Sequence, residues 1–372
     1  MAFVGCDELP AMLGEFAFLY VQPPGVLPRE LPTWSFIQNQ IQSMNEMNDI
    51  RQRDIGLTAT ASNDRSVGKV AMEAIQRRIE DLQKCFKRVS QPSSQEVDAD
   101  ESVHKHADES VHKLRVSLRR AIAALEFFRE WVPGHRFQKT RASFKKLLGR
   151  AGNVRDLDLM IIKLRSDPSR GAKKLLFKLT KDRDRLQQPL LHLGNKYSAD
   201  HFVSDLIAHL FPSTDQQEDP IWSSAYGPWA IDRIQKQAEQ FMHRAVQTNS
   251  DNKSLHRLRI IGKKLRYGLE LLEPILPDVL ASPVYAQLKE IQALLGEIHD
   301  LIVRKSALKI YRNRSQRKFI RDFIDQQIRK DKVELKTLLD RWNRTWSSGQ
   351  LSAFERNLRT LLRVDCRNES ID

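Results

Sequence analysis

The sequence predicts an all-α protein made of two similar helical bundles that are related by a pseudo-twofold axis. Strand signals are scarce after residue 67, whereas apolar residues recur at three- and four-residue steps through most of the chain. Breaks that contain Pro or Gly separate these helical segments, and one segment of about 50 residues occurs twice. Because this repeat is far longer than a solenoid unit, the two copies are expected to form facing half-domains.

Composition narrows the class of protein further. The 372 residues include 61 Lys and Arg against 47 Asp and Glu, a net charge of +14, which favours an anionic partner. With 41% hydrophobic residues the chain has enough apolar content for an ordinary core. The three cysteines, Cys6, Cys85 and Cys366, form no disulfide framework or CxxC metal motif, so a reducing cytoplasm is expected.

No membrane segment is expected near the start of the chain. The longest apolar stretch there, residues 16–21, is far shorter than the roughly 20 residues of a spanning helix. Residues 1–67 contain a Pro cluster and small polar runs, and we expect them to form a mostly irregular N-terminal extension. The helical domain is expected over 68–365, with a first half at about 68–220 and a second at about 221–365.

The elements follow from periodicity and breakers. A first helix is expected at about 70–89, and a polar linker follows at 90–98. The heptapeptide ADESVHK then occurs twice, at 99–105 and 107–113, and only the second copy is expected to continue into a long helix. Further helices are expected at 135–151, 155–167, 171–193, 198–210, 228–247, 252–273, 283–297, 299–328, 331–347 and 350–363.

The larger repeat appears when the chain is compared with itself at an offset of 144 residues. Without a gap, eleven identities fall within residues 111–160, where chance would give only a few. His112, Arg115 and Asp156 match His256, Arg259 and Asp300. Arg119-Arg120 matches Lys263-Lys264, a change that keeps the charge. The repeated residues therefore include a cationic pattern as well as apolar positions.

The helix that opens each copy has a cationic face. His112, Arg115 and Arg119 share one stripe with Arg120 beside it, and Leu114, Leu118 and Leu125 lie on the opposite, core-facing side. The second copy repeats the stripe with the residues His256, Arg259, Lys263 and Lys264, extended by Arg266 and Tyr267.

No acidic residue relieves the repulsion within either stripe. Like charges one turn apart cost a few tenths of a kcal/mol per pair. A solvated face is the ordinary explanation of one basic stripe, but two stripes in the same register favour an anion as the missing counter-charge.

Two downstream features also match between the copies. Lys145 matches Lys289, and the pattern Gly152-x-x-Arg155-Asp156 matches Gly296-x-x-His299-Asp300. The glycines are expected to allow a tight turn or a close helix contact. The aspartates are expected to cap the next helix or to brace an arginine of the stripe.

These residues resemble a known family. His112-x-x-Arg115-x-x-x-Arg119-Arg120 with Gly152-Asn-Val-Arg155-Asp156 is similar to the first half of a CHAD domain (conserved histidine α-helical domain). The run from His256 to Tyr267, followed by Leu294-Leu295-Gly296-Glu-Ile-His299-Asp300, is similar to its second half. The resemblance extends over about 68–365. It implies two four-helix bundles around a basic groove or pore, binding of inorganic polyphosphate and, for some members, localisation to polyphosphate granules.

The resemblance also implies a set of ligand contacts. Carried over residue by residue, they are His112, Arg115, Arg119, Arg120, Lys145, His256, Arg259, Lys263, Lys264, Arg266 and Lys289, with Arg155 and His299 as neighbours. Two departures stand out. The ExExK signature of the CYTH triphosphatase domain, to which many members are fused, is absent, and residues 1–67 match no part of the family.

Enzyme and metal functions have little support in the sequence. It contains no GxxxxGK[ST], HExxH or GxSxG motif. His299-Asp300 resembles the metal-binding pair of HD phosphohydrolases, but the matching pair is Arg155-Asp156, and Arg is not a metal ligand. His104 and His112 lie in the two copies of the heptapeptide and His106 lies between them, and the three would bind a metal only if they folded together. We therefore expect no catalytic residue, no metal and no cofactor.

Nucleic acid is the main alternative ligand, because it is also a phosphate chain. Single-strand binders interleave aromatic platforms with their basic residues, whereas here only Tyr267 accompanies the stripes. The sequence therefore favours non-catalytic binding of inorganic polyphosphate.

Overall fold

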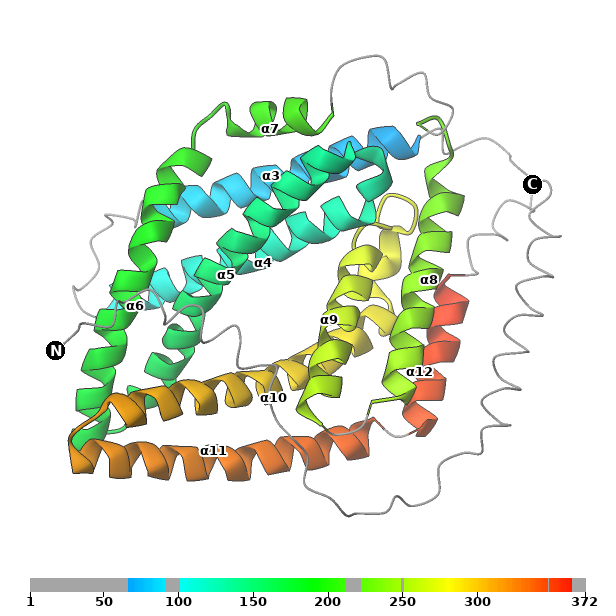
Figure 1. The fold of residues 1–372 in the computed structure, drawn as a ribbon. Coiled ribbons are helices and arrows are strands. Elements are labelled where there is room, and N and C mark those ends of the chain that lie inside the picture. The colour runs from blue at the N-terminus through cyan, green and yellow to red at the C-terminus, as the bar shows by residue number, and fades with distance from the viewer. Residues whose placement is uncertain (1–65, 91–100, 212–221, 249–250, 347, 363–372) are drawn as a thin grey trace.

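A computed structural model describes residues 66–90, 101–211, 222–248, 251–346 and 348–362. Within these ranges the regular structure is helical, and the one pairing of extended residues is an isolated bridge between Ser66 and Ala225. The predicted all-α class is therefore confirmed (Figure 1). The predicted N-terminal extension lies, except for its last two residues, outside the described residues.

The helices fall into two sequential sets. The first set is α3 (Val67–Ser90), α4 (Glu101–Phe127), α5 (Gly134–Leu164), α6 (Arg170–Tyr197) and α7 (Phe202–Leu210). The second set is α8 (Tyr226–Val246), α9 (Asn252–Leu269), α10 (Pro283–Arg314), α11 (Lys318–Thr345) and α12 (Ser348–Leu361). Short 3-10 helices, Arg129–Trp131 and Pro277–Ala281, follow α4 and α9.

Several predictions about helix limits are wrong. The predicted helix 299–328 is interrupted, because α10 ends at Arg314, and α11 begins at Lys318 and continues through the predicted break at 329–330. The predicted breaks at 152–154 and at 298, beside Gly152 and Gly296, are absent, because α5 and α10 continue through them. A single Gly inside a helix costs only about 1 kcal/mol relative to Ala, and burial of Val154, Leu157 and Ile298 on the same helices outweighs that cost. The first heptapeptide is also helical from Glu101, because α4 begins there and continues through the second copy.

The two predicted roles of these glycines also fail. Gly152 and Gly296 make neither a turn nor a close contact, since a Cβ atom placed on either would meet nothing within 4 Å. Asp156 and Asp300 lie in helix interiors, so they do not cap a following helix.

Corresponding helices of the two sets contact one another. Within the sets, α4 packs on α3 and α5, and α9 packs on α8 and α10. Between the sets, α4 contacts α9, α5 contacts α10, and α6 contacts α11. Figure 1 shows α10 and α11 side by side along one edge of the molecule, where α11 meets α6. This matching is what a twofold relation requires, and the axis itself stays a prediction.

The apolar side chains form two cores, and α5 and α10 pass from one to the other. The larger core contains residues of both sets, including Leu118 and Leu265. The smaller core joins the second parts of α5 and α10 to the first parts of α6 and α11, with Leu164, Leu175 and Leu308 among its members. In α5 the change falls between Val154 of the larger core and Leu157 of the smaller one. Arg155 and Asp156 therefore lie at the boundary of the two cores.

Two buried ion pairs flank the smaller core. Asp158 of α5 accepts from Arg183 of α6 at 2.9 Å, and Arg304 of α10 lies 3.1 Å from Asp331 of α11. The acid is on the third helix of the first half but on the fourth helix of the second half. If α5 packed on α11 and α10 packed on α6, the two acids would meet each other and so would the two arginines. Because unpaired buried charges are costly, this order favours the pairing of α5 with α6 and of α10 with α11.

Candidate cation cluster between α4 and α9

The apolar faces of α4 and α9 fix the direction of their cationic faces. Leu114, Leu118 and Leu125 are 0% exposed, as the sequence predicts. Leu258, Leu265 and Leu269 of α9 are also 0% exposed. Asp251 caps the start of α9, where its carboxylate accepts from the backbone of Lys253 and Ser254. With both apolar faces buried and the two helices in contact, their basic residues meet.

Four of these residues, which we call the cation cluster, lie close enough for their charges to influence one another: Arg115 and Arg119 of α4, and Arg259 and Lys263 of α9. Burial and the positive charges of Arg119, Arg259 and Arg115 lower the pKa of Lys263 to about 6. Burial and the charge of Arg119 also lower the pKa of Arg115, to about 10. Burial, followed by Arg119, lowers the pKa of Arg259. The two stripes therefore face each other, and each makes the other harder to charge.

The cation cluster lacks direct counter-charges. None of its four residues forms an ion pair with any residue that the structure describes. The Nε atoms of Arg115 and Arg259, which occupy matching positions of the repeat, are buried without a hydrogen-bond partner in the same described ranges. A buried donor without a partner costs about 1–3 kcal/mol. The arrangement therefore lowers stability unless an anion is bound.

Asp156 and Asp300 supply the nearest negative charge. Burial raises the pKa of Asp156, while the charge of Arg115 opposes this rise. The charge of Asp300 favours the protonated forms of Arg115, Arg259 and Lys263, so it partly opposes the lowering of their pKa values. These two carboxylates offset only part of the charge of the cation cluster, so the site retains a net positive charge.

Three histidines adjoin the cation cluster and are neutral at pH 7. His256 and His299 lie with their Nδ1 atoms 3.4 Å apart and their ring centres 4.9 Å apart. Burial, then the charge of Arg259, lowers the pKa of His299 to about 3 and also lowers that of His256. Burial, then Arg155, lowers the pKa of His112. In the His256–His299 contact one ring nitrogen donates and the other accepts, so both rings cannot be charged without losing it.

The other predicted contacts lie apart from the cation cluster. Arg120 is bound to Glu270 at 2.9 Å, and Lys145 lies 4.0 Å from Glu126. The guanidinium of Arg266 lies 4.8 Å from the ring centre of Tyr267. Lys264 and Lys289 are exposed. The structure thus brings together His112, Arg115, Arg119, Arg155, His256, Arg259, Lys263 and His299, and gives Arg120 and Lys145 acidic partners.

Glu270 is an organising residue that sequence reasoning missed. Its side chain is 4% exposed, and its carboxylate meets Arg120 of α4 and, at 3.5 Å, Arg78 of α3. The hydroxyl of Tyr285 in α10 donates to it at 3.0 Å. Glu126, its match in the repeat, accepts from Arg141 at 2.6 Å. The signal was present in the sequence, because this Glu is one of the eleven identities of the repeat.

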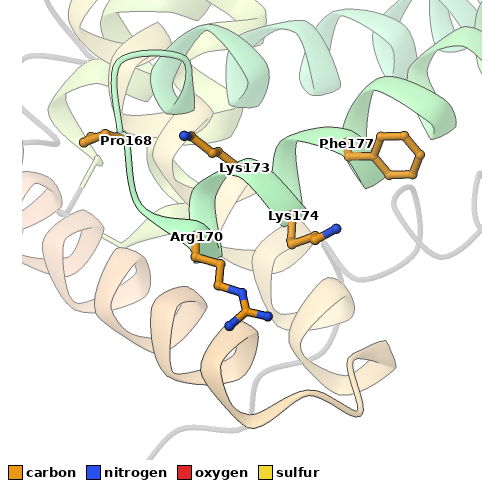
Figure 2. A pocket seen from close by; sticks show the side chains of 5 residues that line it. All are labelled: Pro168, Arg170, Lys173, Lys174 and Phe177. Carbon is orange, nitrogen blue, oxygen red and sulfur yellow. The ribbon is translucent and has the colours of Figure 1, made fainter.

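A separate open pocket lies at the start of α6. Figure 2 shows its lining residues, Pro168, Arg170, Lys173, Lys174 and Phe177. None of them belongs to the predicted site, so the pocket and the cation cluster are different features of the surface.

Metal and membrane features are not found in the described part of the chain. Its side chains include no group of three His, Cys, Asp or Glu residues that could hold a metal ion. Side chains of α4 are described only from Glu109 onward, so His104 and His106 are outside this test. Across the described ranges, every helix is too short or too polar to cross a membrane.

Fold and site together define a class: an all-α protein in which a His-led cationic helix occurs twice and the two copies meet. The profile of the CHAD domain matches residues 94–309, more than half of the chain and within the range that the sequence resemblance covers. The chain belongs to the CHAD domain family.

One solved structure supports this fold. The crystal structure of the CHAD domain from the plant Ricinus communis is similar with a TM-score of 0.56 and 17% identity, over 82% of this chain and 95% of that one. A second similar structure, PptA from Streptomyces chartreusis, has a TM-score of 0.46 and 14% identity, over 80% and 99% of the two chains. No curated protein sequence matches the chain.

Proposed function

We propose that this protein binds inorganic polyphosphate through the cation cluster and does so without catalysis. One observation carries the proposal: Arg115, Arg119, Arg259 and Lys263 converge from matching positions of two helices without forming an ion pair in the described chain. A protein that used these charges only for solubility would leave them spread over exposed faces. Converging cations that raise each other's energy fit a ligand that carries several closely spaced negative charges.

The proposed binding mechanism is electrostatic. Each guanidinium donates to phosphate oxygens, and a charge-assisted hydrogen bond of this kind contributes about 1.5–3 kcal/mol. Release of counterions from the polyanion adds a favourable entropy, by analogy with DNA. Lys263 and the histidines bind protons as the anion arrives, because a neighbouring negative charge favours their protonated forms.

The surroundings of the cation cluster favour polyphosphate over nucleic acid. Single-strand binders stack bases on accessible aromatic rings. Tyr267 is the one aromatic residue of the cationic stripes, and it is 5% exposed with Arg266 against its ring. It is therefore not available as a stacking platform. A chain of phosphates without bases needs no such ring.

Competition at fixed ionic strength tests the choice of ligand. Labelled long-chain polyphosphate, bound to the full chain, is challenged with unlabelled polyphosphate, single-stranded DNA and triphosphate at equal phosphate concentration. We expect polyphosphate to displace the label at the lowest concentration. Equal or better displacement by DNA would replace the proposal with nucleic-acid binding, and failure of the label to bind at all would reject both.

Non-catalytic binding and granule localisation have their own tests. The length of bound polyphosphate should stay unchanged on a gel over hours of incubation with the protein, with and without Mg²⁺. Chain shortening would instead indicate a hydrolase.

In cells that accumulate polyphosphate, we expect a fluorescent fusion to gather on the granules and a fusion with Arg115→Ala and Arg259→Ala to spread through the cell.

A further inference from the structure

The open pocket at the start of α6 has a chemistry of its own. Its volume is about 510 Å³, and it is lined by Pro168, Arg170, Lys173, Lys174 and Phe177. Three of these residues are cations and none is acidic, so the pocket favours a negatively charged ligand. Its volume lies within the range of small-molecule sites, about 300–1,000 Å³.

Helical spacing places the cations and an aromatic ring on one face of α6. Arg170, Lys173, Lys174 and Phe177 are separated by steps of one, three or four residues, so they project from the same side of the helix. The opposite side of this part of α6 packs in the smaller core. Figure 2 shows Lys174 between Arg170 and Phe177 along the helix.

The ring of Phe177 is accessible to a ligand. Phe177 is 71% exposed, more than any other large apolar residue in the described ranges. A single exposed apolar residue is ordinary on a protein surface. What distinguishes Phe177 is its position, because it lines a pocket beside three cations. An aromatic face in such a place can stack on a planar ring of a ligand.

The charges of the pocket are also available. Arg170, Lys173 and Lys174 form no ion pair with any residue in the described part of the chain. The guanidinium of Arg170 lies 4.8 Å from the ring centre of Phe319 in α11, a contact that orients it. The nearest acid in the sequence, Asp167, accepts from the backbone of Ser169 at 3.0 Å.

We infer that this pocket is a second binding site and that its ligand is a nucleoside triphosphate. The base stacks on Phe177, and the phosphates bind Arg170, Lys173 and Lys174. A polyphosphate chain would use the cations but has no group for the ring. The flat surface of a bilayer would not fill a concave pocket. The site shares no residue with the cation cluster, so the inference does not depend on the proposed function.

Calorimetric titration of the full chain with ATP, inorganic triphosphate and adenosine tests this site. The protein carries Arg115→Ala and Arg259→Ala, so that nucleotide bound at the cation cluster does not contribute. We expect ATP to bind at one site and about tenfold more tightly than triphosphate, because only ATP has a base that stacks. Adenosine, which lacks phosphates, should bind more weakly than either. Equal affinity for ATP and triphosphate, or no binding of ATP, would overturn the inference.

Substitutions in the same background separate the ring from the charges. Phe177→Ala should weaken ATP binding about tenfold and leave the affinity for triphosphate unchanged. Lys174→Ala should weaken the binding of both about fivefold. Lys336→Ala removes one charge from an exposed position of α11 and should change neither affinity. ATP affinity that is unchanged by Phe177→Ala would overturn the role of the ring and with it the choice of a nucleotide.

Two further measurements distinguish this site from other uses of the same face. Polyphosphate should bind Phe177→Ala, in an otherwise unchanged chain, as tightly as it binds the parent protein. Failure of the parent to bind polyphosphate while ATP binds at this pocket would reject the proposed function and leave the inference intact. Sedimentation with phosphatidylserine vesicles should not depend on Phe177. Vesicle binding that Phe177→Ala abolishes, in a protein that does not bind ATP, would replace the inference with contact to an anionic membrane.

Discussion

Arg120 lies 2.9 Å from the buried carboxylate of Glu270, whereas its neighbour Arg119 faces Arg259 and Lys263 without an ion pair in the described chain. The two arginines are adjacent in the sequence and equal in charge, and only the packing of α4 separates their environments. One side chain serves the fold and the other serves the cation cluster. This difference provides a matched pair of substitutions.

Arg119→Ala should mainly lower the affinity for polyphosphate, whereas Arg120→Ala should mainly lower the stability of the fold. Loss of Arg119 removes repulsion and one phosphate donor, so polyphosphate affinity should fall about tenfold with unchanged or increased stability. Loss of Arg120 removes a partner of the buried Glu270, so the free energy of unfolding should fall by about 1–3 kcal/mol. Urea unfolding and fluorescence titration measure the two quantities. Equal destabilisation by both substitutions would contradict the assignment.

Arg115→Ala and Arg259→Ala should weaken polyphosphate binding by similar amounts, because they occupy matching positions and each has a buried Nε without a partner among the described residues. We expect each to cost about 1–2 kcal/mol of binding free energy with little loss of stability. The slope of log affinity against log salt should also become less steep. Arg257→Ala, at an exposed position of α9, is the control. Parent-like affinity in either variant would remove that arginine from the site.

Gly152→Ala and Gly296→Ala should stabilise the protein and weaken its binding. Alanine favours a helix interior over glycine by about 1 kcal/mol, and its Cβ would meet no atom within 4 Å at either position. These glycines lie one turn before Arg155 and His299, so a methyl group there would narrow the approach to the cation cluster. Gly149→Ala, on the same helix, also meets no atom and should stabilise without changing affinity. Unchanged affinity in both site variants would mean that the ligand does not approach along this face.

Polyphosphate binding should tighten as the pH falls from 8 to 6. The free protein holds the pKa of Lys263 near 6, and a bound anion raises it, so the complex takes up protons between these two values. His256 and His112 act in the same direction at lower pH, because burial lowers their pKa in the free protein. Calorimetry in buffers of different ionisation enthalpy measures the uptake, which should shrink in Lys263→Arg. Proton release on binding would be the opposite of the expected result.

Lys263→Met should raise stability below about pH 8. The unfolded chain keeps the pKa of this lysine near 10.4 while the folded protein holds it near 6, so the unfolded state binds more protons throughout that window. The contribution of Lys263 to stability therefore falls as the pH decreases from 10 to 6, and methionine removes this loss. Thermal unfolding at pH 6.5 and pH 9.5 should show a larger gain for the variant at the lower pH. Lys264→Met, at the exposed neighbouring position, should show no such difference.

The sequence predicted the helical class and the composition of the cation cluster because both depend on local patterns. Apolar spacing placed Leu118 and Leu265 in the core, and the repeat matched Arg115 with Arg259. It could not separate Arg119 from Arg120, since a rotation of α4 by a fraction of a turn decides which of them reaches Glu270. That rotation depends on packing against α3 and α9, which no local pattern encodes.

The errors in helix limits have a related cause. The predicted breaks at 152–154 and at 298 lie beside Gly152 and Gly296, yet α5 and α10 continue through both positions. Tertiary packing decides here, because α5 must be long enough to reach from Phe144 of the larger core to Leu164 of the smaller one. Only the existence of a second core explains a helix of that length.

The smaller core also opposes the electrostatic repulsion between α4 and α9. Mutual repulsion of the basic side chains pushes α4 and α9 apart, while Leu164, Leu175, Leu308 and Ile324 hold the far ends of the halves together. The apolar contacts of the smaller core therefore oppose the repulsion between α4 and α9. A bound polyanion should reduce the repulsion between the basic side chains. Amide exchange along α4 and α9 should therefore be slower in the complex.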